Sequence, residues 1–226
     1  MEIYLTILFL LALTLIFVRF YLGVYKPKDY SIKVANVQNL GDSEWQSNYF
    51  TVLPKRNSHL VCLADGIVDT KSGRLAAIIA VDTVKTTFVK EKFPTFLEFV
   101  KNSKMAIEKN LRENINTNSL NIHLTILKVE DYIIYYENMG NTVMVYRNTE
   151  LIYLSGNSRF SLKPGDVIIV GSEGTMENLK EVYIRWYLGL TDLSLKEKSY
   201  MLLKKALSSQ RSRNQTLIIL EVPQRI

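Results

Sequence analysis

The residue types that most often carry chemistry are few in this chain. It has one cysteine, Cys62, and two histidines, His59 and His123. One cysteine cannot form an internal disulfide, and one cysteine with two histidines cannot build a zinc site of the usual kind. A bound metal ion would therefore need carboxylate ligands.

Neither histidine is placed by the sequence to act as a base for the cysteine. Cys62 lies inside an expected strand, so we expect a small buried hydrophobe rather than a nucleophile. His123 alternates with apolar residues and is expected at the surface or at a strand edge.

Periodicity and turn residues divide the chain into the elements that must position these groups. Three strands are followed by two helices, a strand-rich block, two more helices and a final strand. Runs of strands and runs of helices favour an α+β fold over alternating α/β. The expected strands are residues 31–37, 49–53, 59–64, 121–129, 131–137, 142–147, 151–154, 167–170 and 216–222, and the expected helices are residues 75–84, 96–111, 176–188 and 195–207.

The composition is that of an ordinary globular protein. The chain has 226 residues, is 47% hydrophobic and carries a net charge of 28 − 22 = +6. It is too apolar for disorder and long enough for one domain with its own core. No Gly-rich phosphate loop precedes a helix, and no basic stripe with interleaved aromatic residues is present. Neither nucleotide nor nucleic-acid binding is therefore expected.

An apolar segment at the N-terminus predicts a membrane anchor. Ile3 to Val18 contains only two polar residues, both threonine, and beyond Arg19 the apolar pattern continues to Tyr25. As a helix, this segment would be about 35 Å long, enough to span a bilayer core. A cleaved signal peptide is the alternative, but no basic region precedes the segment and no small-residue cleavage site follows it.

The charges that flank this segment predict its orientation. Arg19, Lys26 and Lys28 lie at its carboxyl side, whereas Glu2 is the only charged side chain on the amino side. The positive side should be cytoplasmic. We therefore expect a single-pass cell-membrane protein with its N-terminus outside, in which residues 1–28 are the anchor and basic juxtamembrane segment and residues 29–226 form a cytoplasmic domain.

Four segments of this domain carry motif-like residues in a fixed order. They are Leu63-Ala64-Asp65-Gly66 with Gly73-Arg74-Leu75-Ala76-Ala77, then residues 137–147, 162–174 and 213–219. They resemble the motifs of the metal-dependent serine/threonine protein phosphatases of the PPM type, also called type 2C. The resemblance covers about residues 31–222. It implies a β-sandwich of two antiparallel sheets flanked by pairs of helices, preceded here by one N-terminal transmembrane helix.

The resemblance also implies where a metal site would lie. Members of that family hold two divalent ions through acidic side chains, and a metal-bound water attacks the phosphoester. Asp65 matches the ligand that bridges both ions, and the Gly66 carbonyl matches the backbone ligand beside it. Ser47 stands where the family has an early acidic ligand, Glu173 replaces an aspartate, and Arg213 replaces the terminal aspartate.

Arg213 puts a cation where the family binds cations, so no ordinary two-metal centre and no manganese or magnesium cofactor is expected. Val68-Asp69-Thr70 also replaces the Gly-Gly-His of the family motif. We hypothesise that Arg213 pairs with Asp65 and Glu173 in place of the metals. The alternative is that Arg213 points into solvent from the loop before the last strand.

The function expected from these features is that of a catalytically inactive relative, a pseudophosphatase. It would act as a binding scaffold or regulator in a membrane complex on the cytoplasmic face, with a membrane protein or a phosphoprotein as partner. One alternative is an active phosphatase that holds one manganese or magnesium ion through Asp65, Gly66 and Glu173, with help from Asp69 or Asp166. The other is an unrelated membrane-tethered adaptor.

Overall fold

The computed structural model describes residues 4, 11–15, 17–19, 32–55, 58–68, 70–90, 93–115, 122–208 and 213–223. The chain divides into two units, Met1–Ser31 and Ile32–Ile226. In the first unit, residues 11–15 and 17–19 are helical, and they include Val18 and Arg19 of the expected anchor. Ile3 and Tyr25, between which the anchor was predicted, lie outside the described residues. No helix of the described part is long and apolar enough to cross a membrane.

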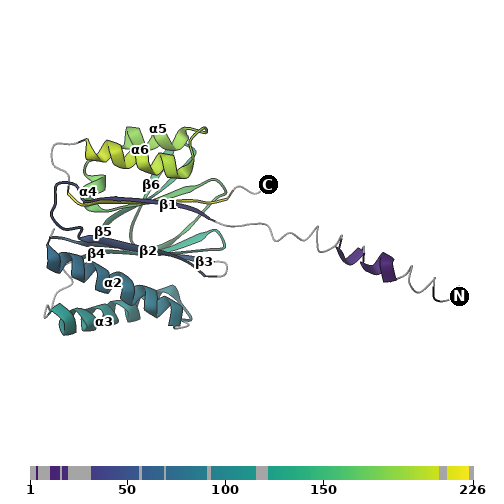
Figure 1. Ribbon diagram of the computed structural model, residues 1–226, viewed down its shortest axis with the longest axis horizontal. Helices are drawn as coiled ribbons and strands as arrows, with labels where there is room; N and C mark the ends of the chain where they lie inside the picture. Colours follow the sequence, from purple (N-terminus) through teal and green to yellow (C-terminus); the bar gives the residue numbers. More distant parts are fainter. Residues whose placement is uncertain are drawn as a thin grey trace. The chain divides into compact units, whose positions relative to one another are not determined.

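The second unit is α+β, as the order of elements predicted. Its described part has eight antiparallel strands and five helices. Figure 1 shows the strands in the middle, α2 and α3 on one side, and α5 and α6 on the other. The elements are β1 (Lys33–Asn39), β2 (Asn48–Lys55), β3 (Ser58–Gly66), α2 (Lys71–Lys90), α3 (Phe96–Ile115), β4 (Ile122–Glu130), β5 (Ile133–Arg147), β6 (Glu150–Ser161), β7 (Val167–Gly171), α4 (Glu173–Met176), α5 (Glu181–Gly189), α6 (Leu195–Leu207) and β8 (Gln215–Glu221).

The strands form one curled sheet rather than the two separate sheets that were predicted. The order is β1-β8-β7-β5-β4-β3-β2, with β6 also paired to β5. The first half of β5 pairs with β4 and the second half pairs with β7, while β6 runs beside both halves. Because β5 belongs to both layers, the two halves of the sandwich stay hydrogen-bonded to each other.

Three apolar cores separate these layers. One lies between α2, α3 and the outer faces of β3 and β4, the second lies between the two halves of the sheet, and the third lies under α5 and α6. Residues of β3 contribute to two of these cores, because successive side chains of a strand point to opposite faces. Leu60 and Cys62 face the helices, while Val61 and Leu63 face the other half of the sheet. Cys62 is fully buried, as expected, and burial raises the pKa of its thiol.

Several predicted boundaries were wrong. The Asn138–Asn141 segment was interpreted as a turn between two strands, but β5 continues through it with a register shift opposite β6. The Asn138 amide donates to the Asn141 carbonyl at 2.8 Å, and its oxygen accepts from the Thr125 hydroxyl at 2.7 Å. These side chains therefore support a bulge instead of a chain reversal.

Two other elements also differ from the prediction. The strand at residues 151–154 extends to Ser161 as β6, and the helix at residues 176–188 is two helices, α4 and α5.

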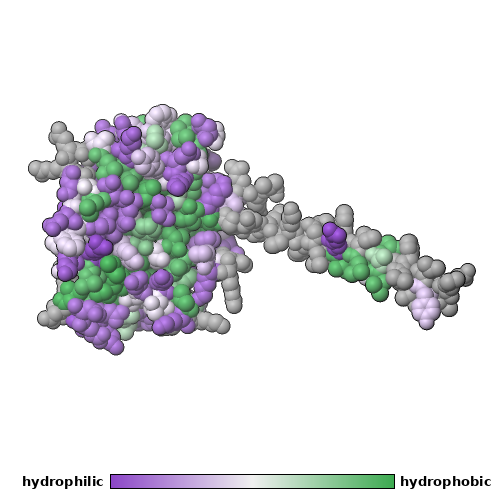
Figure 2. Space-filling model, in the orientation of Figure 1, coloured by the Kyte–Doolittle hydropathy of each residue, from purple (hydrophilic) through white to green (hydrophobic). Residues whose placement is uncertain are grey.

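The second unit exposes a mixed surface: on the face in Figure 2, hydrophobic and hydrophilic residues of its described part are interspersed.

Candidate functional site

The end of β3 brings three of the predicted site residues together. Asp65 and Gly66 are the last residues of β3, and Asp65 pairs with Asn48 across the β2–β3 ladder. The Gly66 N–H donates to the Ser47 carbonyl at 3.1 Å. A side chain at position 66 would collide with the backbone of Gly73, at the start of α2. The two glycines therefore allow the start of α2 to approach the end of β3 closely, next to Asp65.

A buried asparagine attaches the start of β8 to this region. Asn214 accepts the Ser47 N–H on its side-chain oxygen at 2.9 Å and donates to the Trp45 carbonyl at 2.9 Å. Its own carbonyl accepts from the Asn48 amide at 3.2 Å. The preceding residue, Arg213, is therefore held close to the loop that carries Ser47.

Two buried hydroxyls fix the other side of the site. The Thr216 N–H, in β8, lies 3.1 Å from the Ser172 hydroxyl oxygen and 2.9 Å from that of Thr175. The Ser172 N–H donates to the Thr216 carbonyl at 3.0 Å. Since Ser172 immediately precedes Glu173, these bonds align α4 with the beginning of β8.

Arg213, just before β8, and Glu173, the first residue of α4, form an ion pair. Arg213 Nη1 lies 3.3 Å from Glu173 Oε2. A Cβ on Gly174 would lie 2.8 Å from Cβ of Arg213, so the glycine permits the approach. The two side chains are 60% and 39% exposed, respectively, so the pair contributes little to stability. Of the two partners expected for Arg213, the structure shows an ion pair with Glu173, and the Arg213 side chain also reaches solvent.

The sequence interpretation missed His123. It was expected at a surface or strand edge, yet it faces Asp65 across the β3–β4 ladder. Its Nδ1 lies 3.9 Å from Glu173 Oε2 and has no hydrogen-bond partner within the described chain. His123 therefore lies close to Glu173, and its backbone pairs with that of Asp65. Both strands were predicted, but strand periodicity alone does not give the register that brings these residues together.

Gly140, in the bulge of β5, packs against the His123 ring. Its φ is +91°, and a side chain there would collide with the ring. The bulge therefore has a role in the site, because it leaves room for the histidine.

Asp166 belongs to a different structure. It was a candidate for holding a single ion, but it receives two hydrogen bonds from the Arg147 guanidinium, at 2.9 and 2.6 Å. The Lys163 N–H donates to the same carboxylate at 2.6 Å. Asp166 thus closes the turn before β7. The other candidate, Asp69, lies outside the described residues.

The donor set does not fit two divalent ions. Such ions bind several charged oxygens, whereas Ser47 supplies a neutral hydroxyl and Glu173 has a guanidinium beside one of its oxygens. Within the described ranges, no three His, Cys, Asp or Glu side chains are close enough together to hold a metal.

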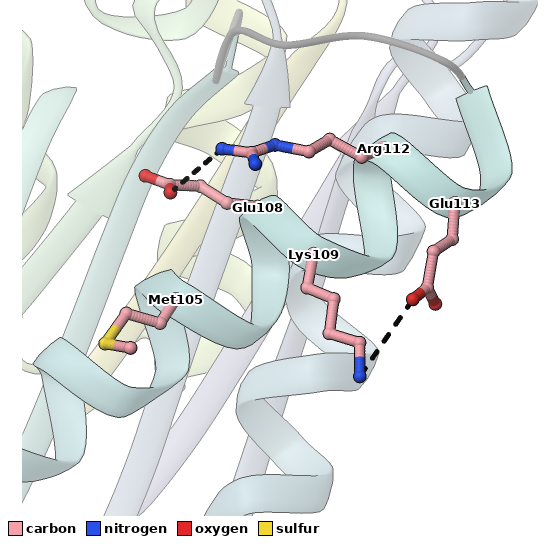
Figure 3. Close-up of a pocket in the computed structure, with 5 residues that line it drawn as sticks. All are labelled: Met105, Glu108, Lys109, Arg112 and Glu113. Carbon is pink, nitrogen blue, oxygen red and sulfur yellow. Dashed lines mark ion pairs between the residues drawn. The ribbon is translucent and has the colours of Figure 1, made fainter.

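A surface concavity on α3 is a less suitable candidate site. Figure 3 shows its five lining residues, all from this one helix: Met105, Glu108, Lys109, Arg112 and Glu113. The charges satisfy one another, with Lys109 at 4.0 Å from Glu113 and Arg112 at 3.9 Å from Glu108. These pairs lie on the exposed surface of the helix.

Comparisons with known proteins give the fold. No family model and no curated protein matches the sequence. The serine/threonine phosphatase of S. agalactiae is similar in structure, with a TM-score of 0.74 and 14% identity over 85% of this chain and 100% of that one. PppA, described as a key regulatory component of T6SS in Pseudomonas aeruginosa, has a TM-score of 0.72 and 14% identity, over 84% and 96% of the two chains.

A third structure is the Mycobacterium tuberculosis serine/threonine phosphatase PstP/Ppp. It gives a TM-score of 0.70 and 11% identity, over 85% of this chain and 99% of that chain. The order of elements, the curled antiparallel sheet between two helix pairs and these matches agree. This chain has the α+β fold of the PPM-type serine/threonine phosphatases.

Proposed function

We propose that this chain is a pseudophosphatase: a PPM-phosphatase-like domain that acts by binding rather than by metal-dependent hydrolysis. The observation that carries the proposal is the 3.3 Å ion pair between Arg213 and Glu173. In the PPM-type phosphatases that this sequence resembles, acidic metal ligands occupy both of these positions. A guanidinium beside Glu173 satisfies that carboxylate and repels a divalent cation.

Ser47 supports the same proposal. Its backbone is engaged on both sides, because its N–H donates to Asn214 and its carbonyl accepts from Gly66. These bonds hold the Ser47 backbone in place, but the Ser47 hydroxyl offers no negative charge to a metal ion. In one relative's structure, the catalytic domain of PstP is in complex with two manganese ions. The site proposed here would lack two of the carboxylates expected for such a centre.

We also propose that the apolar segment at residues 3–25 anchors the domain to the cell membrane, with the domain on the cytoplasmic face. A tethered domain meets other membrane components at raised effective concentration, so weak binding is sufficient. The partner would be a membrane protein complex or a phosphoprotein. That PppA is described as a regulatory component in its organism supports a regulatory role without identifying a partner.

The test is calorimetric titration of the full chain with manganese and magnesium, followed by a phosphatase assay on the same sample. We expect neither metal binding nor turnover. The double variant Ser47→Asp with Arg213→Asp should bind manganese, with an affinity about tenfold or more above the weakest that the titration can detect, because it removes one cation and adds two anions near Asp65. Arg159→Asp, which changes an exposed residue of β6, is the matched control and should behave as wild type.

Manganese-dependent turnover by the wild-type chain that Asp65→Ala abolishes would contradict the proposal and identify a phosphatase with a remodelled site. The anchor is tested separately by alkaline extraction of membranes. The full chain should remain with the bilayer, and its release into the supernatant would refute the membrane part of the proposal.

A further inference from the structure

Helix α5 exposes large side chains on the face turned away from the core. Val182 and Trp186, one helical turn apart, are 62% and 58% exposed, and Tyr153 of the neighbouring strand β6 is 54% exposed. The opposite face of α5 is buried through Ile184 and Leu188. Figure 1 shows α5 in the outer helix layer, on the side opposite α2 and α3. Tyr153, Glu181, Val182, Arg185 and Trp186 are called the α5 patch below.

Hydrogen bonds within the chain hold the polar side chains of the α5 patch in place without a partner. The Tyr153 hydroxyl donates to Glu181 Oε1 at 2.7 Å, and Arg185 Nη2 donates to Glu181 Oε2 at 2.8 Å. Arg185 also reaches the Thr149 carbonyl at 3.4 Å. Burial, followed by the bond to Glu181, raises the pKa of Tyr153 to about 12, so its hydroxyl remains a donor at neutral pH.

Such ordering lowers the entropy that binding would cost. Tryptophan, tyrosine and arginine are also the residue types that most often dominate binding energy in protein interfaces. An ordered, exposed set of these three on one helix and its neighbouring strand is therefore suited to protein contact.

We propose that the α5 patch is a two-fold interface with a second copy of this chain. The patch is complementary to a second copy of itself. If the α5 helices of two copies pack antiparallel, Val182 of one copy faces Trp186 of the other, and the same contact occurs twice. Glu181 and Arg185 are also one turn apart, so the same arrangement brings each glutamate near the arginine of the other copy.

The charges favour a second copy over a strongly charged partner. The patch contains one carboxylate and one guanidinium, which cancel, so neither an acidic nor a basic partner would find net complementarity. A copy of the same surface complements both the charges and the apolar residues. This self-association concerns a surface distinct from the end of β3 and does not depend on whether the chain is an enzyme.

The experiment is sedimentation velocity of the full chain in a mild detergent, over about 1 to 100 µM, the range suited to a small interface. We expect a concentration-dependent dimer. Arg185→Glu should weaken it by about tenfold or more, because two carboxylates would then face two others. Glu181→Arg combined with Arg185→Glu should restore the dimer, since opposite charges again meet.

The matched control is Lys109→Glu on α3. Lys109 is an exposed member of an i,i+4 ion pair with Glu113, like Arg185 with Glu181, but it lies outside the patch. This variant should dimerise as the wild type does. A chain that stays monomeric throughout the range, or a dimer that Arg185→Glu leaves unchanged, overturns the proposal.

A second readout locates the interface. Because Cys62 is fully buried, a Val182→Cys variant has one accessible cysteine side chain among the described residues. A short bifunctional thiol reagent should link two copies of this variant. A sample that sediments as a dimer but gives no linked species would have its interface elsewhere, and the proposal would then be wrong.

Discussion

At the scale of single residues, the site depends on glycines and amides more than on ionised groups. Gly66, Gly73, Gly140 and Gly174 each lie where a side chain would meet neighbouring atoms at close range. Asn214 joins the loop before β2 to the start of β8 through both ends of its side chain. These contacts bring Asp65, His123, Glu173 and Arg213 into one region, and they do so independently of the chemical role of these charged groups.

Gly140 and Gly156 form a matched pair for testing this packing. Both have positive φ, +91° and +72°, but only Gly140 faces an obstacle, the His123 ring; around Gly156 the space is open. Gly156→Ala should cost only the backbone strain, about 1–2 kcal/mol of unfolding free energy. Gly140→Ala should cost about 1–3 kcal/mol more, because the ring must move.

Urea unfolding of the two variants and the wild type measures this difference. Equal losses for both variants would mean that the His123 ring moves aside freely, and that Gly140 has no packing role at the site.

At the scale of elements, strands and helix ends follow local rules that the sequence displays. Ser194 precedes α6 and forms a capping box with Glu197: the Glu197 N–H donates to the Ser194 hydroxyl, and the Glu197 carboxylate accepts the Ser194 N–H at 2.8 Å. The serine and glutamate three residues apart are the sequence signature of this motif. Among the elements that were mispredicted, β5 also depends on a contact with β7, while β6 pairs only with β5 among the described strands.

The capping box gives a pH-dependent prediction. The hydrogen bonds from the Ser194 side chain and backbone lower the pKa of Glu197 below its ordinary value of 4.5. A lowered folded-state pKa means that the carboxylate stabilises the fold above its ordinary pKa and that this contribution is lost as the pH falls through the folded-state value. Ser194→Ala removes the N-cap hydrogen bond and should destabilise the chain at pH 7, by about 1 kcal/mol, the usual cost of losing a serine cap.

The loss caused by Ser194→Ala should shrink as the pH falls below about 4.5, because protonated Glu197 no longer benefits from these bonds. Urea unfolding at a series of pH values gives the comparison, with Ser155→Ala in exposed β6 as control. A loss that is constant with pH would show that the cap acts through Ser194 alone.

At the scale of the whole molecule, the curled sheet links the three cores into one folding unit. β5 contributes to both halves of the sheet, and β3 supplies residues to two cores. Opening one layer would therefore expose the next. Cys62 lies in the core under α2, with no exposed surface.

Cys62 can report on this cooperativity. Burial protects its thiol and raises its pKa, so thiolate is scarce while the chain is folded. We expect a thiol reagent to modify Cys62 slowly in water, and the modification to rise with urea along the same curve as loss of far-UV circular dichroism. The introduced thiol of Val182→Cys, at a position exposed in the single chain, should react at once in a sample dilute enough to be monomeric. Modification of Cys62 well below the unfolding midpoint would mean that α2 detaches from the sheet locally.

The sequence alone predicted the fold class of this protein and most of its secondary structure. Alternation and turn residues predicted the α+β class, most strands and helices, and the burial of Cys62, because these properties depend on which neighbours along the chain are apolar. The same local signals failed at Asn138–Asn141, where asparagine and glycine support a bulge as readily as a turn. The motif order led to the PPM-type fold, although no family model matches the chain.

The tertiary structure decided what depends on register and on contacts between distant segments. A shift of one residue between β3 and β4 would turn His123 away from Asp65, and no local pattern distinguishes the two alignments. The approach of Arg213 to Glu173 likewise depends on Asn214 and Ser172, which fasten parts of the chain about 40 to 170 residues apart. The sequence determined which groups are available, and the packing of the sheet determined which of them meet.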